Sequence, residues 1–266
     1  MMIWRFVLGQ FGGVMKQFIK NYWKTLVFFA AVGLVGGFFT GLFVLDSYPE
    51  ELQQEALAQG LTPTIMAIVT AMQAAGYGAL LGAAGIWLGK RTRLWKDETR
   101  LSRKPLLITL AFSLVGGLAL ILPDLFFFGK YNEVIMNSYA AKPSIPYIIG
   151  SVLYGGVIEE VMLRLFWMTL VAFLLWKLFA KNEEKPTVAI LMIANVVAAI
   201  LFAAGHLPAT LMMIGSSPMV LIRCFLLNGG FGLLFGYLYR KHGLRYAMLA
   251  HGGCHIISKL IWILFI

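Results

Sequence analysis

Long apolar segments separated by short polar loops dominate the hydropathy pattern of this chain. A helix needs about 20 mostly apolar residues to cross a bilayer. Six segments have the length of a single crossing, and we expect a membrane-spanning helix in each: Leu26–Leu45, Ile65–Leu88, Leu106–Phe128, Val188–His206, Met219–Tyr239 and Ala247–Phe265. A seventh segment, Ile145–Phe179, is longer than one crossing requires, and it forms either one tilted or kinked helix or two segments broken near the middle. The pattern therefore predicts seven or eight spans.

The first 25 residues have a helical rather than a uniformly apolar pattern. Apolar residues recur at spacings of three and four from Trp4 to Tyr22, and basic and amide residues lie mostly on the opposite face. A basic amphipathic helix of this kind lies in the headgroup region of a membrane. We therefore divide the chain into an amphipathic interfacial helix (1–25), N-terminal transmembrane helices (26–144) and a C-terminal core (145–266).

The composition excludes a water-soluble protein. Of the 266 residues, 60% are hydrophobic and 13% are charged, whereas a soluble domain carries about 25% charged residues. Too few polar groups are present to cover a globule in water, and the same composition excludes disordered, collagen-like and disulfide-stabilised chains. The predicted fold is an all-α, polytopic transmembrane bundle.

The distribution of charge predicts an orientation in the membrane. The net charge of +10 comes from basic clusters before the first span, between the second and third spans, and before the last span, whereas acidic residues follow the first span. The positive-inside rule places the N-terminus in the cytoplasm. We expect an integral, multi-pass protein of a prokaryotic cell membrane, with the lipid bilayer as a partner and no nucleic-acid partner.

Within the longest apolar segment, the stretch Val152–Leu170 contains three charged residues, Glu159, Glu160 and Arg164. Such residues cost roughly 3 kcal/mol or more at the bilayer centre, so they indicate function. Glu160 and Arg164 are four residues apart on one helical face and can neutralise each other. Glu159 points about 100° away from Glu160 and has no partner in its own helix, which suits a general acid or base. An ionic cluster that serves packing alone would explain Glu160 and Arg164 but leaves Glu159 unexplained.

Three of the four histidines also lie in apolar segments. His206 ends one predicted span, and His251 and His255 share a helical face of the last span. Gly252 and Gly253 lie between them and leave room for a backbone or a substrate to approach. Three intramembrane histidines together with an unpaired glutamate favour a catalytic site over isolated packed side chains.

These residues resemble the motifs of one family, the CPBP (Abi) intramembrane proteases, which include the type II CAAX prenyl endoproteases and bacterial immunity-type relatives. The similarity covers about residues 145–260. Three motifs carry it: E-E-x-x-x-R at Glu159, Glu160 and Arg164; F-x-x-x-H at Phe202 and His206; and H-x-x-x-N at His251 and His255, where this chain has His in place of Asn.

The resemblance implies hydrolysis of a peptide bond in a membrane-associated substrate, such as a prenylated CAAX-like protein or a bacteriocin-like peptide. In the glutamate mechanism, which needs no cofactor, Glu159 and His206 would activate water. His251 and His255 would donate hydrogen bonds to the developing oxyanion. Because Asn is always a neutral donor and His needs the right tautomer or charge, activity is expected to depend more on pH here than in relatives with Asn.

The remaining motif residues have supporting roles in this comparison. Glu160 with Arg164 would hold the helix and the first glutamate in place, and Phe202 belongs to the motif of His206.

Other readings of the same residues stay open. Glu159, His206 and His251 could form a catalytic zinc site with one open position, and His255 could be a further ligand, although the sequence lacks the H-E-x-x-H pattern. A transporter with an intramembrane Glu/His relay and a non-catalytic scaffold are the alternatives from other classes.

The predicted spans conflict with the predicted site. His206 lies near the outer end of its span and His251 near the inner end of its own, so straight helices would hold them apart. Tilted or short helices around a water-filled cavity would reconcile the two. We expect the span boundaries, rather than the motif match, to need revision.

Overall fold

The computed structural model describes residues 2–97 and 100–266, and the side chains of residues 2–12 and 14 lie outside the description. Within this part of the chain all regular structure is helical. In chain order the α-helices and π-helical segments are α1 (Met2–Val44), α2 (Glu50–Ala58), α3 (Pro63–Gly76), π-segment Tyr77–Leu81, α4 (Gly82–Thr92), α5 (Arg103–Phe126), α6 (Glu133–Asn137), α7 (Ile145–Gly150), π-segments Ser151–Glu159 and Val161–Met168, α8 (Thr169–Phe179), α9 (Val188–Ile214), α10 (Pro218–Cys224), π-segment Phe225–Gly229, α11 (Gly230–His242) and α12 (Leu244–Phe265). Short 3₁₀ turns cover Leu45–Ser47 and Phe128–Lys130.

Seven helices in the described residues are long and apolar enough to cross a membrane, which confirms an all-α polytopic fold. They are Met15–Ser47, Pro63–Thr92, Arg103–Lys130, Ile145–Phe179, Val188–Ile214, Pro218–His242 and Leu244–Phe265. The long segment Ile145–Phe179 is a single helix and is not broken into two. Two π-helical stretches widen its turns, a feature often found at functional sites.

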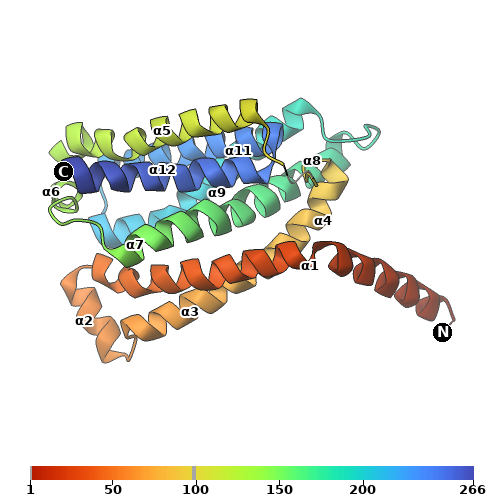
Figure 1. Cartoon of the computed structure of the whole chain (residues 1–266), viewed down its shortest axis with the longest axis horizontal. Helices are drawn as coiled ribbons and strands as arrows, with labels where there is room; N and C mark the ends of the chain where they lie inside the picture. Colours follow the sequence, from red (N-terminus) through yellow and green to blue (C-terminus); the bar gives the residue numbers. More distant parts are fainter. Residues whose placement is uncertain (1, 98–99) are drawn as a thin grey trace.

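The predicted N-terminal helix is present as the first part of α1, which continues without a break into the first span. The apolar stripe predicted from Trp4 to Val14 lies outside the described side chains. The first part of α1 extends away from the bundle at the end where the α8–α9 loop also lies (Figure 1).

Small residues let the helices approach closely. Gly33, Gly37 and Gly41 recur every four residues on α1, and a Cβ at any of them would collide with the backbone of α3. This small-residue spacing is typical of helix pairs in membranes. Figure 1 shows α1 and α3 side by side beneath the layer that contains α5, α7, α9, α11 and α12.

A second close approach positions the candidate site. A Cβ at Gly156 would lie 2.9 Å from the Cα of Gly252, and a Cβ at Gly253 would collide with the side chain of Ser113 on α5. The predicted room beside Gly252 and Gly253 is thus taken by neighbouring helices. As a result, α12 packs directly against the π-helical segment that ends at Glu159.

Several predicted span boundaries differ from the structure, and the corrections at α9 and α12 remove the conflict between His206 and His251. Helix α9 continues through Pro208 to Ile214, because apolar residues follow the proline and neighbouring groups can compensate for it inside a membrane helix. Helix α12 begins at Leu244, directly after Gly243, whose φ of 106° ends α11. Both histidines therefore lie well inside their helices.

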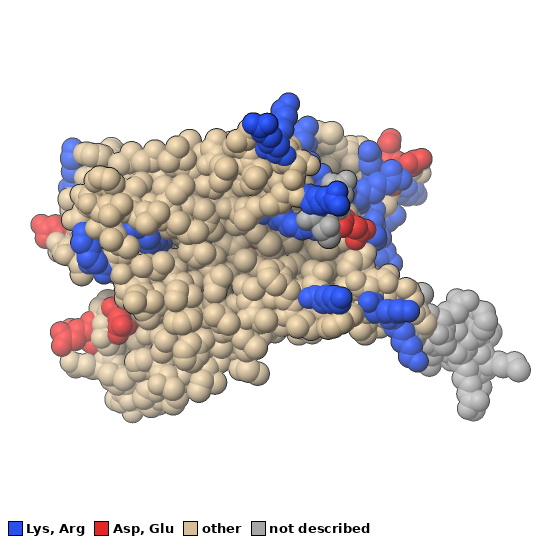
Figure 2. Space-filling model, viewed as in Figure 1, with Lys and Arg blue, Asp and Glu red and all other residues tan. Residues whose placement is uncertain are grey.

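Charged residues gather at the two ends of the bundle. Most Lys and Arg in this view lie at the end that carries the α4–α5, α8–α9 and α11–α12 connections, whereas the opposite end carries fewer of them together with the acidic residues of α2 (Figure 2). The long sides between these ends are almost free of charge in this view. A bilayer around the uncharged band would leave both charged ends in water.

Candidate active site

Three helices bring the predicted catalytic residues together. Glu159 ends a π-helical segment, His206 lies on α9, and His251 lies on α12. One carboxylate oxygen of Glu159 is 3.8 Å from Nε2 of His206, and the other is 3.8 Å from Nε2 of His251. These distances exceed a direct hydrogen bond, so both histidines face the glutamate across a short gap.

The Nδ1 atom of His206 is held by its own helix. It lies 2.8 Å from the carbonyl oxygen of Phe202, one turn earlier. A carbonyl can only accept, so Nδ1 carries a proton, and in the neutral ring Nε2 presents a lone pair toward Glu159. The Phe202 ring packs against the imidazole with centroids 4.7 Å apart. The F-x-x-x-H spacing thus supplies both a ring contact and a backbone acceptor to His206.

His251 is oriented in a similar way by a carboxylate. Its Nδ1 lies 2.8 Å from Oε1 of Glu160, and its ring stacks on Phe235 of α11 with centroids 4.5 Å apart. Neutral His251 therefore also presents a lone pair on Nε2 toward Glu159. Neither the contact with Glu160 nor that with Phe235 was predicted, because both join distant helices and neither leaves a local sequence pattern.

Glu160 also forms the ion pair that its spacing predicts. Its carboxylate is 3.1 Å from Nη1 of Arg164, and both side chains are almost completely buried. The guanidinium lies over the rings of Phe202 and Phe235, at 4.6 and 5.4 Å from their centroids, in favourable cation–π geometry. Arg164 therefore links the two aromatic rings that contact His206 and His251.

His255 faces the same space as His251. Their ring centroids are 5.0 Å apart. A Cβ at Gly155 would lie 2.9 Å from Nε2 of His255 and 3.6 Å from Nε2 of His251. Gly155 precedes Glu159 by four residues in the same π-helical segment. The absence of a side chain at Gly155 therefore lets the Nε2 atoms of both histidines lie close to this residue.

The distances between the site residues differ from those around a bound zinc ion, whereas the contacts of the histidine Nδ1 atoms are like those of zinc ligands. No group of three or more His, Cys, Asp or Glu side chains in the described part of the chain is placed to hold a metal ion. Ligand atoms around tetrahedral zinc are about 3.3–3.5 Å apart, whereas Glu159 is 3.8 Å from each histidine. The Nδ1 atoms of His206 and His251 do contact acceptors, as zinc ligands commonly do.

A second buried ion pair lies outside this site. Nε and Nη2 of Arg223 on α10 are each 2.6 Å from one carboxylate oxygen of Asp124 on α5. The hydroxyl of Tyr139 donates to the same carboxylate at 3.0 Å. The cluster lies at the end of the bundle where α5 ends and α10 begins, and the sequence analysis did not predict it.

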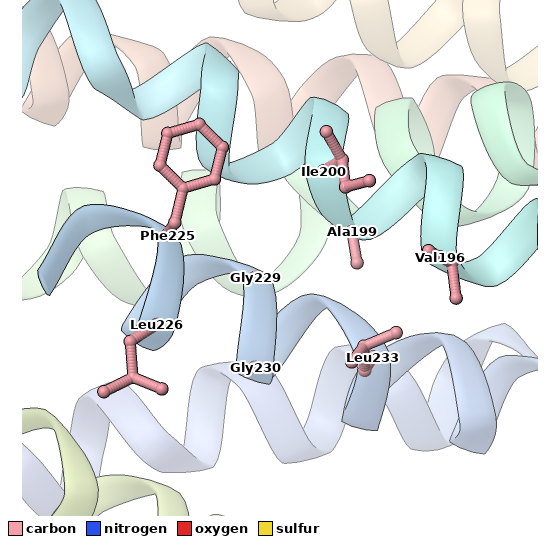
Figure 3. Close-up of a pocket in the computed structure, with 8 residues that line it drawn as sticks. All are labelled: Val196, Ala199, Ile200, Phe225, Leu226, Gly229, Gly230 and Leu233. Atoms are coloured by element: carbon pink, nitrogen blue, oxygen red, sulfur yellow. The ribbon is translucent and has the colours of Figure 1, made fainter. Parts of the chain in front are cut away.

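The groove in Figure 3 is separate from the titratable residues. It lies between α9 and the helix formed by α10, the following π-segment and α11, and its lining includes Val196, Ala199, Ile200, Phe225, Leu226 and Leu233. All of its lining residues are apolar or glycine, and none belongs to the three motifs. The groove therefore offers no group for acid–base chemistry.

Comparison with known proteins supports the motif match. The family model described as type II CAAX prenyl endopeptidase Rce1-like matches residues 141–257. That range contains every motif residue from Glu159 to His255. No curated protein and no solved structure matches the chain.

Proposed function

We propose that Glu159 and His206 activate water for peptide-bond hydrolysis. The match of residues 141–257 to the type II CAAX prenyl endopeptidase Rce1-like family model supports a CAAX-type intramembrane endopeptidase in general. The observation that supports this proposal most directly is the convergence of Glu159 with His206 and His251 from three helices. The match favours proteolysis, so neither a transporter nor a non-catalytic scaffold is proposed.

Water activation needs proton acceptors around one oxygen atom. Glu159 and Nε2 of neutral His206 are both acceptors, and a water between them can donate one hydrogen to each. Its lone pair is then free to attack the scissile carbonyl carbon while one proton passes to the acceptor pair. The side chain of His206 is 37% exposed and that of Glu159 is 17% exposed, so the site is open on the side of His206.

The tetrahedral intermediate then carries negative charge on the former carbonyl oxygen. Donors that are positioned in advance for this oxygen give a large part of the catalytic effect. We place the oxyanion in the space beside Gly155, where Nε2 of His255 and Nε2 of His251 converge. His251 can donate there only as an imidazolium, because its Nδ1 proton is directed to Glu160. Collapse of the intermediate breaks the C–N bond, and the amine leaves with the proton taken from water.

The substrate is proposed to be a membrane-associated peptide or protein. A family of CAAX-type proteases and a site within seven apolar helices imply a substrate that reaches the bilayer. A prenylated CAAX-like protein and an unlipidated bacteriocin-like peptide are the two substrate classes to compare. The basic clusters at one end of the bundle support a cytoplasmic N-terminus, and we propose a prokaryotic cell membrane as the location.

Purified full-length protein in lipid nanodiscs tests the proposal. Matched peptides with and without a prenyl group are incubated with the protein, and the products are identified by mass spectrometry. We expect endoproteolytic cleavage by wild-type protein and by Glu183→Gln, a matched control at an exposed acidic residue outside the site. Loss of cleavage in His206→Ala but not in the control supports the assignment. Equal cleavage by His206→Ala would contradict it.

A zinc-dependent protease that uses Glu159, His206 and His251 is the second candidate. The observation in its favour is that both histidines have Nδ1 on an acceptor and Nε2 directed at Glu159. In that case the metal would supply the polarisation of water and substrate. The two candidates differ in their response to a chelator.

A further inference from the structure

Lys259 is a buried cation next to the candidate oxyanion site. It lies on α12 one turn after His255, and only 5% of the residue is exposed. Its Nζ is 3.2 Å from Nδ1 of His255 and 4.4 Å from the ring centroid of Tyr147. Within the described part of the chain Lys259 forms no ion pair with a carboxylate. A buried charge without a counterion is costly within a membrane, so this lysine calls for a role beyond packing.

The contact between Lys259 and His255 defines which ring nitrogen carries the proton. An ammonium has three N–H donors and no acceptor. At 3.2 Å from this group, Nδ1 of His255 has to accept, because a proton on Nδ1 would place two donors against each other. The single proton of the neutral ring is then on Nε2. That nitrogen is the one that faces the space beside Gly155.

His251 and His255 therefore carry their protons on different nitrogens, although they lie one turn apart on α12. Nδ1 of His251 contacts the carboxylate of Glu160, an acceptor, whereas Nδ1 of His255 contacts the ammonium of Lys259, a donor. Neutral His251 thus has a lone pair on Nε2 and neutral His255 has an N–H there. Only residue 255 offers the site an N–H without needing a positive charge.

We propose that Lys259 is a positioning residue that fixes His255 as an Nε2–H donor toward the oxyanion. This inference rests on the proposed function, because the Nε2–H donor of His255 has this role only if the site stabilises an oxyanion. The motif that the chain resembles has Asn at position 255, and an Asn amide donates in every charge state. With Lys259 one turn away, an imidazole supplies an equivalent neutral donor. The same contact disfavours His255 as a zinc ligand, since the second nitrogen of a ligating histidine normally faces an acceptor.

Nitrogen NMR of full-length protein with ¹⁵N-labelled histidine tests the tautomer directly. The chain has four histidines, and the signals of residue 255 are those that disappear in His255→Asn. We expect a protonated Nε2 and an unprotonated Nδ1 in wild-type protein and in Lys259→Arg, whose guanidinium also only donates. In Lys259→Met we expect a second tautomer with the proton on Nδ1. A wild-type ring with its proton on Nδ1, or a doubly protonated ring, would overturn the proposal.

Cleavage kinetics supply the second readout. For Lys259→Met we expect kcat to fall about tenfold or more with little change in KM, because one oxyanion donor contributes roughly 10²–10³ in kcat. Lys259→Arg should restore most of the loss. Lys142→Met is the matched control, since Lys142 also contacts α12 but bonds only to the backbone oxygens of Trp262 and Ile263; we expect wild-type rates from it.

The two readouts separate this inference from the proposed function. The tautomer is measured without a substrate, so a protein that cleaves nothing can still show the predicted ring. If wild-type protein cleaves peptides while Lys259→Met loses activity with an unchanged Nε2–H tautomer, the lysine has only a structural role and the inference fails.

Discussion

Two ionic clusters in the described part of the bundle, one around Asp124 and one around Glu159, differ in how completely their charges are paired. Asp124 accepts from two nitrogens of Arg223, each at 2.6 Å, and from the hydroxyl of Tyr139. Glu159, by contrast, lies 3.8 Å from both His206 and His251. The first cluster is closed on itself, whereas the second leaves space between its members.

This difference separates structure from chemistry. The Asp124 carboxylate accepts hydrogen bonds from Arg223 on α10 and from Tyr139 in the loop after α6. This bidentate pairing holds α5 to both segments and stabilises helix packing. Burial, reinforced by the Asp124 carboxylate, raises the pKa of Tyr139, and its hydroxyl stays a donor over the physiological range. Glu159 keeps accepting capacity for a water or a substrate. A partly buried carboxylate with unused capacity between two histidines is suited to acid–base catalysis.

The largest effect is expected from Glu159→Gln, which tests the open cluster. The substitution keeps the size of the side chain and removes the charge that accepts a proton. Cleavage should fall roughly 10²–10⁴-fold, while the melting temperature stays close to that of wild type. Peptide cleavage and thermal unfolding of the same preparation check both statements. Near-normal cleavage by this variant would remove Glu159 from the mechanism.

Glu160→Gln should lower the stability of the fold in addition to any effect on the rate of cleavage. It leaves Arg164 as a buried charge without a counterion, and breaking a buried pair costs roughly 3–5 kcal/mol. We expect poor expression or a lower melting temperature. Denaturant unfolding of the purified fraction measures the loss of stability. A variant that is as stable as wild type but inactive would instead give Glu160 a direct chemical role through His251.

Asp124→Asn tests the closed cluster. Arg223 would lose its counterion, but it is partly exposed, so we expect a loss of about 2 kcal/mol, less than for a fully buried pair. The rate of cleavage per folded molecule should not change. Asp97→Asn is the matched control, because the Lys90–Asp97 pair is exposed and should contribute less than about 1 kcal/mol. A specific loss of kcat in Asp124→Asn would show that the two clusters are coupled.

Among the substitutions within the site, His255→Asn should have the smallest effect on catalysis. An amide donates without the help of Lys259, so we expect the rate to stay within about tenfold of wild type, a small loss compared with removal of an oxyanion donor. If residue 255 binds zinc, activity should disappear, because an amide is a far poorer zinc ligand than imidazole. Kinetics of the purified variant distinguish these results.

Much of the fold could be predicted because its signals are local. Apolar length predicted seven or eight spans, of which the structure has seven in the described residues, and the spacing of Glu160 and Arg164 predicted their contact. The ends of α9 and α12 could not be predicted, since Pro208 is tolerated within an apolar helix and Leu244 follows a glycine that also suits a loop. The boundaries matter because they place His206 and His251 at depths where they can meet.

Within the site, the motif residues were found from the sequence, but their partners were not. The contact of His251 with Glu160 joins residues 91 positions apart, and Phe235 contributes a ring from a third helix. Lys259 lies one turn from His255 and could have been noticed as an ionisable residue within an apolar span. Its significance depends on the direction of the His255 ring, which only the packing against Gly155 defines.

The cleavage rate of purified protein after exhaustive treatment with a strong chelator tests the central claim most directly. If Glu159 and His206 activate water without a metal, the rate with a peptide substrate is unchanged and elemental analysis finds no stoichiometric zinc. Loss of cleavage on chelation, together with recovery when zinc is added back at about one ion per chain, would contradict the account and assign Glu159, His206 and His251 to a zinc site.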